Sequence, residues 1–264
     1  MWSWFKAIDR LLRGELTRLP VLSAGKFEIP LFGFTVVIIL LGGIYGVCMG
    51  VFALTPGGSG HRMQMLAAAI KTPALFLLTL VVTFPSLYVF NALVGSRLLL
   101  PTVLRLLIAS LAVMLAILAS MGTVVAFFSF TTTSYPFMLL LNVVVFAVAG
   151  VLGLSFLLQT LHRLTAAQTL ADAQIVTPAD TSATAPSTEG AGPLQSPPAQ
   201  LPSPQVKVVF RIWIIVFGLV GAQMAWVLRP FIGNPALPFT WFRPPSSNFF
   251  EAVVHAAQHL FMPG

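Results

Sequence analysis

Charged residues are scarce in this chain. Only 8% of its 264 residues are Asp, Glu, Lys or Arg, whereas 57% are hydrophobic. A soluble globular domain carries about 25% charged residues. The composition therefore predicts an integral membrane protein. We expect the formal net charge of +7 to face anionic lipid, and we expect no nucleic-acid partner.

Other chemistry is missing as well. The single cysteine, Cys48, excludes a disulfide framework and a metal site built from cysteines. Carboxylates are absent from the long apolar runs, which argues against an acid–base pair or a proton relay at membrane depth. The GGSG stretch at 57–60 lacks the Gly-Lys-Ser/Thr of a phosphate-binding loop, and the chain has no GxSxG or HExxH motif. We expect no enzymatic activity and no cofactor.

Long apolar runs are what the chain does have. Roughly 20 apolar residues at 1.5 Å per residue are needed to cross a bilayer. The sequence predicts an all-α, polytopic transmembrane helix bundle with about five spans. A four-span unit is expected over 31–161, with spans at about 31–54, 74–94, 104–128 and 138–161, and the fifth span at 207–231.

The segments outside the spans differ in composition. Residues 1–30 are expected to form a cytoplasmic amphipathic helix, ending near Pro20, and a lead-in. This helix either lies in the membrane interface or docks on a partner protein. Residues 162–206 are rich in Pro, Ala, Thr and Ser, which predicts a disordered cytoplasmic linker. Residues 232–264 then form an extracytoplasmic tail.

The basic residues predict the orientation. If the spans alternate, ten of the 14 lysines and arginines fall on the side of the N-terminus. Short cytoplasmic segments carry an excess of Lys and Arg. We therefore expect the N-terminus in the cytoplasm and the C-terminus outside it.

Small residues in two spans are candidates for helix packing. Glycines spaced four apart make two overlapping GxxxG steps on one face of the first span, and such steps let helices approach closely in lipid. They predict either an oligomer contact or packing against another helix of the same chain. The last span carries a second set of small residues. The candidates are Gly42, Gly46, Gly50, Gly218, Gly221 and Ala225.

Polar residues inside the spans have two interpretations. Pro85 removes a backbone donor and is expected to kink its helix. A kink with polar neighbours is found both in transport pathways and in helix bundles held by polar contacts. The residues concerned are Pro85, Ser86, Tyr88 and Asn91 in the second span, Asn142 in the fourth and Gln223 in the last.

Two arginines are candidates for anchoring the tail. Arg229 and Arg243 each precede a proline and lie near aromatic rings, Trp226 and Trp241 among them. The guanidinium groups either reach lipid phosphates or bond carbonyls at helix ends. The prolines favour the second case, in which the tail lies across the outer ends of the four-span unit.

Three further residues form a weak metal candidate. Glu251, His255 and His259 stand four apart and share one face of a predicted helix, and His-x-x-x-His is a workable zinc spacing. A zincin needs Glu directly after the first His, where this chain has Ala256. We assign no metal site.

Several stretches together resemble a family of uncharacterised bacterial multi-spanning inner-membrane proteins. They are KTPALFLLTLVVTFPSLYVFNALVGSRL, SYPFMLLLNVVVFAVAGVLGL, QMAWVLRPF and the FRP and NFF pieces of the tail. The resemblance implies a location in the bacterial inner membrane, hence a periplasmic C-terminus, and implies no activity. The five-span layout is also similar to that of Yip-type membrane proteins.

Two functions remain in contention. One is a non-enzymatic assembly or accessory component, which packs with copies of itself as a homo-oligomer or with a membrane-protein partner, surrounded by membrane lipids. The other is a small oligomeric channel or carrier for a small or uncharged solute, lined by the polar residues above. The lack of charge within the spans disfavours ion-coupled carriers.

Overall fold

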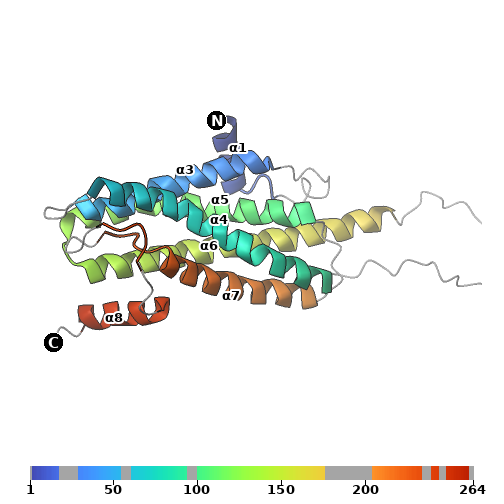
Figure 1. Ribbon diagram of the computed structural model, residues 1–264. Coiled ribbons are helices and arrows are strands. Elements are labelled where there is room, and N and C mark those ends of the chain that lie inside the picture. The colour runs from blue at the N-terminus through green and yellow to red at the C-terminus, as the bar shows by residue number, and fades with distance from the viewer. Residues whose placement is uncertain are drawn as a thin grey trace, which may run out of the picture.

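All regular secondary structure in the described part of the chain is helical. The computed structural model describes residues 2–17, 29–54, 61–93, 100–175, 204–233, 239–243 and 248–261. Its elements are α1 (Trp2–Leu12), α3 (Leu31–Gly50), the 3-10 turn η1 (Val51–Leu54), α4 (His61–Leu93), α5 (Leu100–Thr131), α6 (Tyr135–Ile175), α7 (Pro204–Val227) and α8 (Phe249–Phe261). The prediction of an all-α helical bundle is confirmed (Figure 1).

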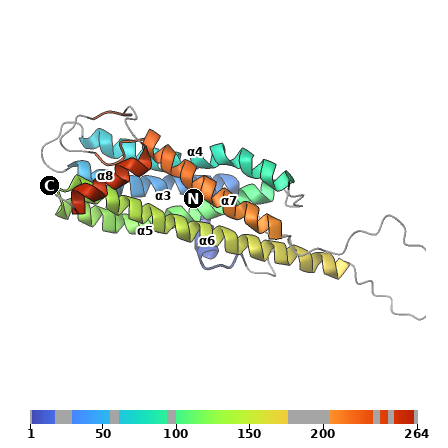
Figure 2. The same ribbon diagram turned by 90° about the horizontal axis from the view of Figure 1, so that it is seen from below.

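Helices α3 to α7 lie side by side along one long axis (Figures 1 and 2). Four helices are long and apolar enough to cross a membrane by length and composition: Leu31–Leu54, Arg62–Val89, Pro101–Thr131 and Tyr135–Leu164. In α7 the apolar part that the described residues include is Arg211–Val227. Its 17 residues span about 25 Å, at the lower limit for a transmembrane helix. The fifth span therefore stays a prediction.

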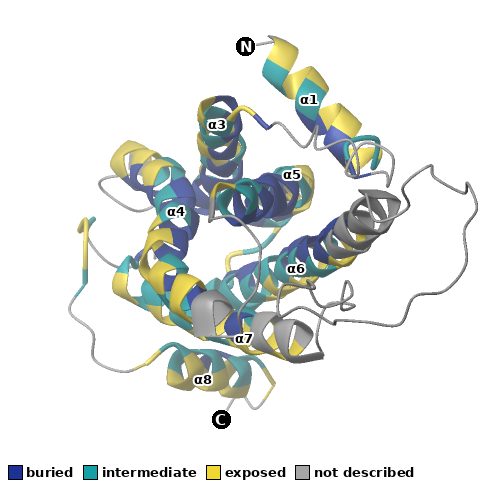
Figure 3. Cartoon of the chain, turned by 90° about the vertical axis from the view of Figure 1, so that its right-hand side faces the viewer, coloured by how far each residue is buried: buried dark blue, intermediate teal, exposed yellow. Residues whose placement is uncertain are grey.

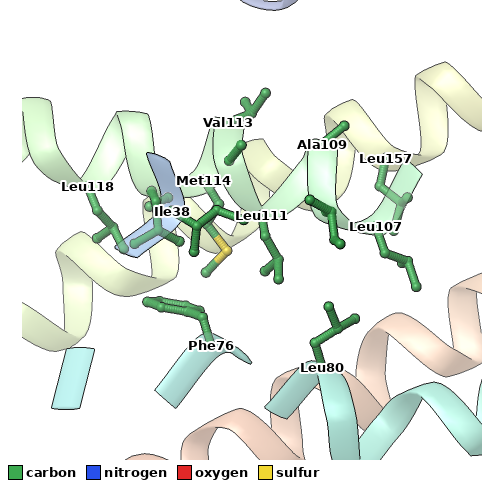
Figure 4. Packing of buried hydrophobic residues seen from close by; sticks show 14 of the residues in the cluster. Ile38, Phe76, Leu80, Leu107, Ala109, Leu111, Val113, Met114, Leu118 and Leu157 are labelled. Atoms are coloured by element: carbon green, nitrogen blue, oxygen red, sulfur yellow. The ribbon is translucent and has the colours of Figure 1, made fainter. Parts of the chain in front are cut away.

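Helix α5 forms the centre of the bundle. It packs on α3 on one side and on α6 on the other, while α4 packs on α3 and α7. Figure 4 shows its side chains meeting residues of three neighbouring helices. The contacts join Leu107, Leu111, Met114 and Leu118 of α5 with Ile38 of α3, Phe76 and Leu80 of α4 and Leu157 of α6. Dispersion contacts of this kind hold helices together where lipid surrounds them.

The glycines of α3 face α4 of the same chain. A Cβ atom on Gly46 would lie 2.7 Å from Cα of Ala69, and one on Gly50 would lie 2.7 Å from Cα of Met65. A Cβ on Gly42 would meet a proline side chain of α4 at 3.0 Å. The structure therefore agrees with the second interpretation of the GxxxG steps, which is packing against another helix of the same chain.

The N-terminal helix lies across the bundle axis (Figure 3). Helix α1 packs on α3 and α5 through Ile8 and Leu11, which are buried. It ends at Leu12, earlier than the predicted end near Pro20. The reason is local: Gly14 has a φ of 72°, a left-handed conformation that terminates helices.

The boundaries of the predicted linker were wrong at both ends. Helix α6 continues to Ile175, and α7 begins at Pro204, so 162–175 and 204–206 are helical rather than disordered. The stretch TAAQTLADAQ consists largely of good helix formers, which lets α6 continue beyond its apolar part. The rest of the predicted linker, 176–203, lies outside the described residues.

Candidate functional site

The chain that follows α7 is docked on the first turns of α4. Gln64 donates from Nε2 to two carbonyl oxygens beyond the end of α7, that of Pro230 at 3.2 Å and that of Phe231 at 2.9 Å. Gly233 lies close by, where a Cβ would stand 2.6 Å from Cβ of Ala53. The approach is so close that only glycine fits without a shift. We call this end of the bundle, with η1, the starts of α4 and α6 and residues 228–243, the tail-docking end.

Lys71 is the second residue of α4 that holds the tail. Its side chain is buried, and Nζ donates to the carbonyl oxygen of Pro230 at 3.4 Å and to that of Trp241. The ammonium also lies 4.7 Å from the ring centroid of Phe242. Burying a charge is unfavourable unless polar or aromatic groups replace water, and the two carbonyls and the ring do so here.

Sequence reasoning missed the role of Gln64 and Lys71. Both were assigned only to the segment between the first two spans. A detectable signal was present, because Lys71 stands within an otherwise apolar stretch, AAAIKTPALF. A lysine in such a stretch needs partners from elsewhere in the chain.

Arg229 and Arg243 lie at the same end. The guanidinium carbon of Arg229 stands 3.8 Å from the ring centroid of Trp226, a stacked cation–π contact. Burial lowers the pKa of Arg229, while the phenol of Tyr135 raises it and the charge of Arg243 lowers it further.

The described hydrogen-bond donors that hold the tail differ from the donors that the sequence predicted. Gln64 and Lys71 make the bonds to tail carbonyls, whereas Arg243 makes no hydrogen bond with a described residue. Trp241 contributes its carbonyl, and its side chain is exposed. Anchoring by the two arginines stays a prediction.

The tail-docking end is strongly cationic. It carries Arg62, Lys71, Arg229 and Arg243. None of the seven acidic residues in the chain belongs to the segments 51–72, 130–137 and 228–243 that form this end.

Helix α8 carries the weak metal candidate and packs on α6 and α7 (Figure 2). Glu251 Oε1 lies 3.9 Å from Nε2 of His255. Within the described residues, no group of three His, Cys, Asp or Glu side chains is placed to hold a metal ion, so His259 does not complete a site with these two. The side chain of Asn248 caps α8 by accepting from the backbone N–H of Glu251 at 2.9 Å.

The polar residues of the spans make separate contacts on different helices. Asn142 is buried in α6, where its Oδ1 accepts from the hydroxyl of Tyr45 at 2.8 Å and its Nδ2 donates to a carbonyl of its own helix. Ser86 donates to the carbonyl oxygen of Thr83 at 2.7 Å. Tyr88 is exposed on the outside of α4. The structure therefore does not bring these side chains together as the lining of one pathway.

The remaining polar candidates are scattered as well. Pro85 lies at an exposed position within the continuous helix α4. The side chain of Asn91 lies outside the described residues. Gln223 is exposed on α7 and makes no hydrogen bond with a described residue.

The small residues of α7 differ in their surroundings. Gly221 faces Thr79 of α4, with 3.6 Å between the position of a Cβ and the methyl group of the threonine. Ala225 packs against the core. Gly218 is exposed, and a Cβ there would meet nothing within 4 Å, so within the described chain it has no packing role.

The fold and the composition together define a helical membrane protein with four apolar helices that are long enough to cross a bilayer. No protein-family model, curated protein or solved structure matches the chain. The resemblance to bacterial inner-membrane proteins stays a prediction.

Proposed function

We propose that this protein is a non-enzymatic assembly or accessory component of a bacterial inner membrane, which acts by packing α7 against α7 of a second copy. The observation that carries the proposal is the exposed amide of Gln223 on an apolar helix. Gln223 precedes Arg229 by six residues, or about 9 Å along a helix axis. An amide at that depth is costly in hydrocarbon unless another polar group bonds it.

A second copy of the chain satisfies this amide. A glutamine side chain both donates and accepts, so two copies of Gln223 can bond each other across a two-fold axis. The exposed glycine on the same helix lets a second backbone come close. The exposed residues among the described side chains of α7 are Val208, Arg211, Ile212, Ile215, Gly218, Leu219, Gln223 and Val227.

The alternative, a channel or carrier, has less support. Most described hydroxyl groups in the spans bond to carbonyls of their own helices, while those of Ser110 and Tyr45 bond groups of α6. Thr72 donates to the carbonyl of Ala68 at 2.9 Å, and Thr79 donates to that of Leu75 at 2.7 Å.

Disulfide cross-linking in membranes tests the proposal. In a Cys48→Ala background, Leu219→Cys should form a dimer across α7. Val151→Cys is the control, because Val151 is 65% exposed on α6 and lies outside the proposed contact. Adding Gln223→Leu should weaken the dimer by roughly 0.6–2 kcal/mol, or about 3- to 30-fold in its dissociation constant. Gln159→Leu, an exposed glutamine on α6, is the matched control.

The outcomes separate the possibilities. A cross-linked product of another mass would make the partner a different membrane protein. Equal dimer yields from Leu219→Cys and Val151→Cys, or a dimer that Gln223→Leu leaves unchanged, would refute packing through α7.

A further inference from the structure

Helix α1 is fixed at the end of the bundle where α3 begins. The ring of Trp4 lies so close to Gly33 that a Cβ there would stand 2.8 Å from Cδ1 of the tryptophan. The same ring meets that of Phe32 edge-on, with 6.0 Å between the ring centroids. Beyond the helix, Arg163 of α6 donates from Nη1 to the hydroxyl oxygen of buried Thr17 at 3.3 Å. These contacts at its two ends hold α1 across the axis of the long helices (Figure 3).

The first turn of α3 marks one surface of the bilayer, because Leu31–Leu54 is long and apolar enough to cross a membrane. Helix α1 contacts that turn through Trp4. A helix that lies across the axis of the spans at this level runs along the membrane surface. One flank of α1 is therefore presented to hydrocarbon and the opposite flank to water.

The side chains of α1 divide in the same way. Ile8 and Leu11 face the bundle and are buried. At about 100° per residue, Phe5 and Leu12 stand together on one side of that buried face. Both are exposed, by 40% and 50%. The exposed residues on the opposite flank are polar, namely Ser3 and Arg10.

We propose that α1 binds the lipid bilayer through the flank formed by Phe5 and Leu12, which enters the edge of the hydrocarbon core. This flank continues the lipid-facing surface of α3, because Phe32, which is 74% exposed on the first turn of α3, lies against Trp4. The tryptophan ring itself belongs to the kind of side chain that accumulates at the level of lipid headgroups. Helix α1 thus anchors the bundle at the membrane surface where α3 begins.

Charge contributes little to this binding. Nε of Arg10 lies 3.3 Å from Oε2 of Glu15, and Nε of Arg13 lies 3.0 Å from Oδ2 of Asp9. Lys6 is the one further charged residue between positions 2 and 17, so this segment has three basic and two acidic residues and a net charge of +1. An acidic partner protein or a purely electrostatic attraction to anionic lipid therefore fits α1 less well than an apolar contact with the bilayer.

Spin labels on the full-length chain test the proposal. In a Cys48→Ala background, Phe5→Cys, Leu12→Cys and the control Ser3→Cys are labelled, and the protein is reconstituted into phosphatidylcholine vesicles with and without phosphatidylglycerol. All three positions are exposed, so the labels leave the packing of α1 intact. Oxygen concentrates in hydrocarbon and a nickel chelate stays in water, so the ratio of their collision rates with a label reports its contact with lipid. This ratio should be several-fold higher at positions 5 and 12 than at position 3, in both kinds of vesicle.

Three results would overturn the proposal. Equal ratios at all three positions, with the nickel chelate reaching each label, would mean that the flank of Phe5 and Leu12 faces water. Slow collisions with both reagents at positions 5 and 12 would mean that a protein covers this flank instead of lipid. A preference for oxygen that is seen only with phosphatidylglycerol would mean that charge, and not the apolar flank, holds α1 on the membrane.

Discussion

The contact between α3 and α4 provides a matched pair of alanine substitutions. A Cβ on Gly46 would stand 2.7 Å from the backbone of Ala68 and Ala69, whereas a Cβ on Gly43 would meet only the carbonyl oxygen of Ala69 at 3.7 Å. Gly46→Ala therefore forces backbone against backbone, and Gly43→Ala fits the space that is present. The two positions are three residues apart on one helix.

The geometry sets the magnitude. To reach ordinary contact at 3.4 Å from 2.7 Å, and to clear the still closer carbonyl oxygen of Ala68, the two helices must separate locally by at least 0.7 Å. Overpacking of this kind costs about 1–3 kcal/mol. Alanine gains about 0.5–1 kcal/mol over glycine in a helix, and this gain applies equally to both variants. The difference between Gly46→Ala and Gly43→Ala therefore isolates the cost of the close approach, about 1–3 kcal/mol.

The measurement is the free energy of unfolding in mixed micelles, followed by far-ultraviolet circular dichroism as the denaturing detergent is increased. Oligomeric size is measured on the same samples. Equal stabilities of the two variants would refute the close approach. A Gly46→Ala variant with unchanged monomer stability but altered oligomeric size would show that the glycines meet a second copy instead of α4.

Two further predictions concern polar contacts between distant segments. Tyr45→Phe should destabilise the bundle by about 0.6–1.7 kcal/mol, because it removes the hydroxyl that donates to Asn142; a double-mutant cycle with Asn142→Leu that gives no coupling would contradict this. Lys71→Met keeps the apolar stem but removes the donor to two tail carbonyls, so protease should cleave the tail several-fold faster than in the wild type. Arg62→Gln is its control, and equal cleavage in both variants would show that Lys71 does not hold the tail.

The apolar runs predicted the existence of the first four spans but not the full lengths of their helices. The second span was expected at about 74–94, whereas α4 already begins at His61. A count of apolar residues identifies the part of a helix that can lie in the hydrocarbon core of a bilayer. It leaves out of the predicted span the helical turns that carry Gln64 or Lys71. Those turns consist largely of good helix formers, MQMLAAAIK, and the docked tail bonds their polar side chains. That contact joins residues about 160 positions apart, which local sequence does not reveal.

The anchoring donors escaped prediction for the same physical reason. The pattern of Arg, Pro and aromatic residues around Arg229 and Arg243 draws attention to the tail. It describes only the tail's own side chains, however, and not the helix that the tail meets. The donors come from α4 because α4 and α7 pack against each other, which brings the start of α4 beside the end of α7. Only the packing of the helices identifies Gln64 and Lys71 as partners of the tail.

Helix α7 is joined to α4 by hydrogen bonds near both of its ends. Within α7, the buried ring of Trp213 donates from Nε1 to the carbonyl oxygen of Thr83 at 3.1 Å. Beyond its other end, Lys71 bonds the carbonyl of Pro230. A hydrogen bond near each end joins α7 to the same neighbouring helix, so α7 is part of one bundle although it follows a long connection in the sequence.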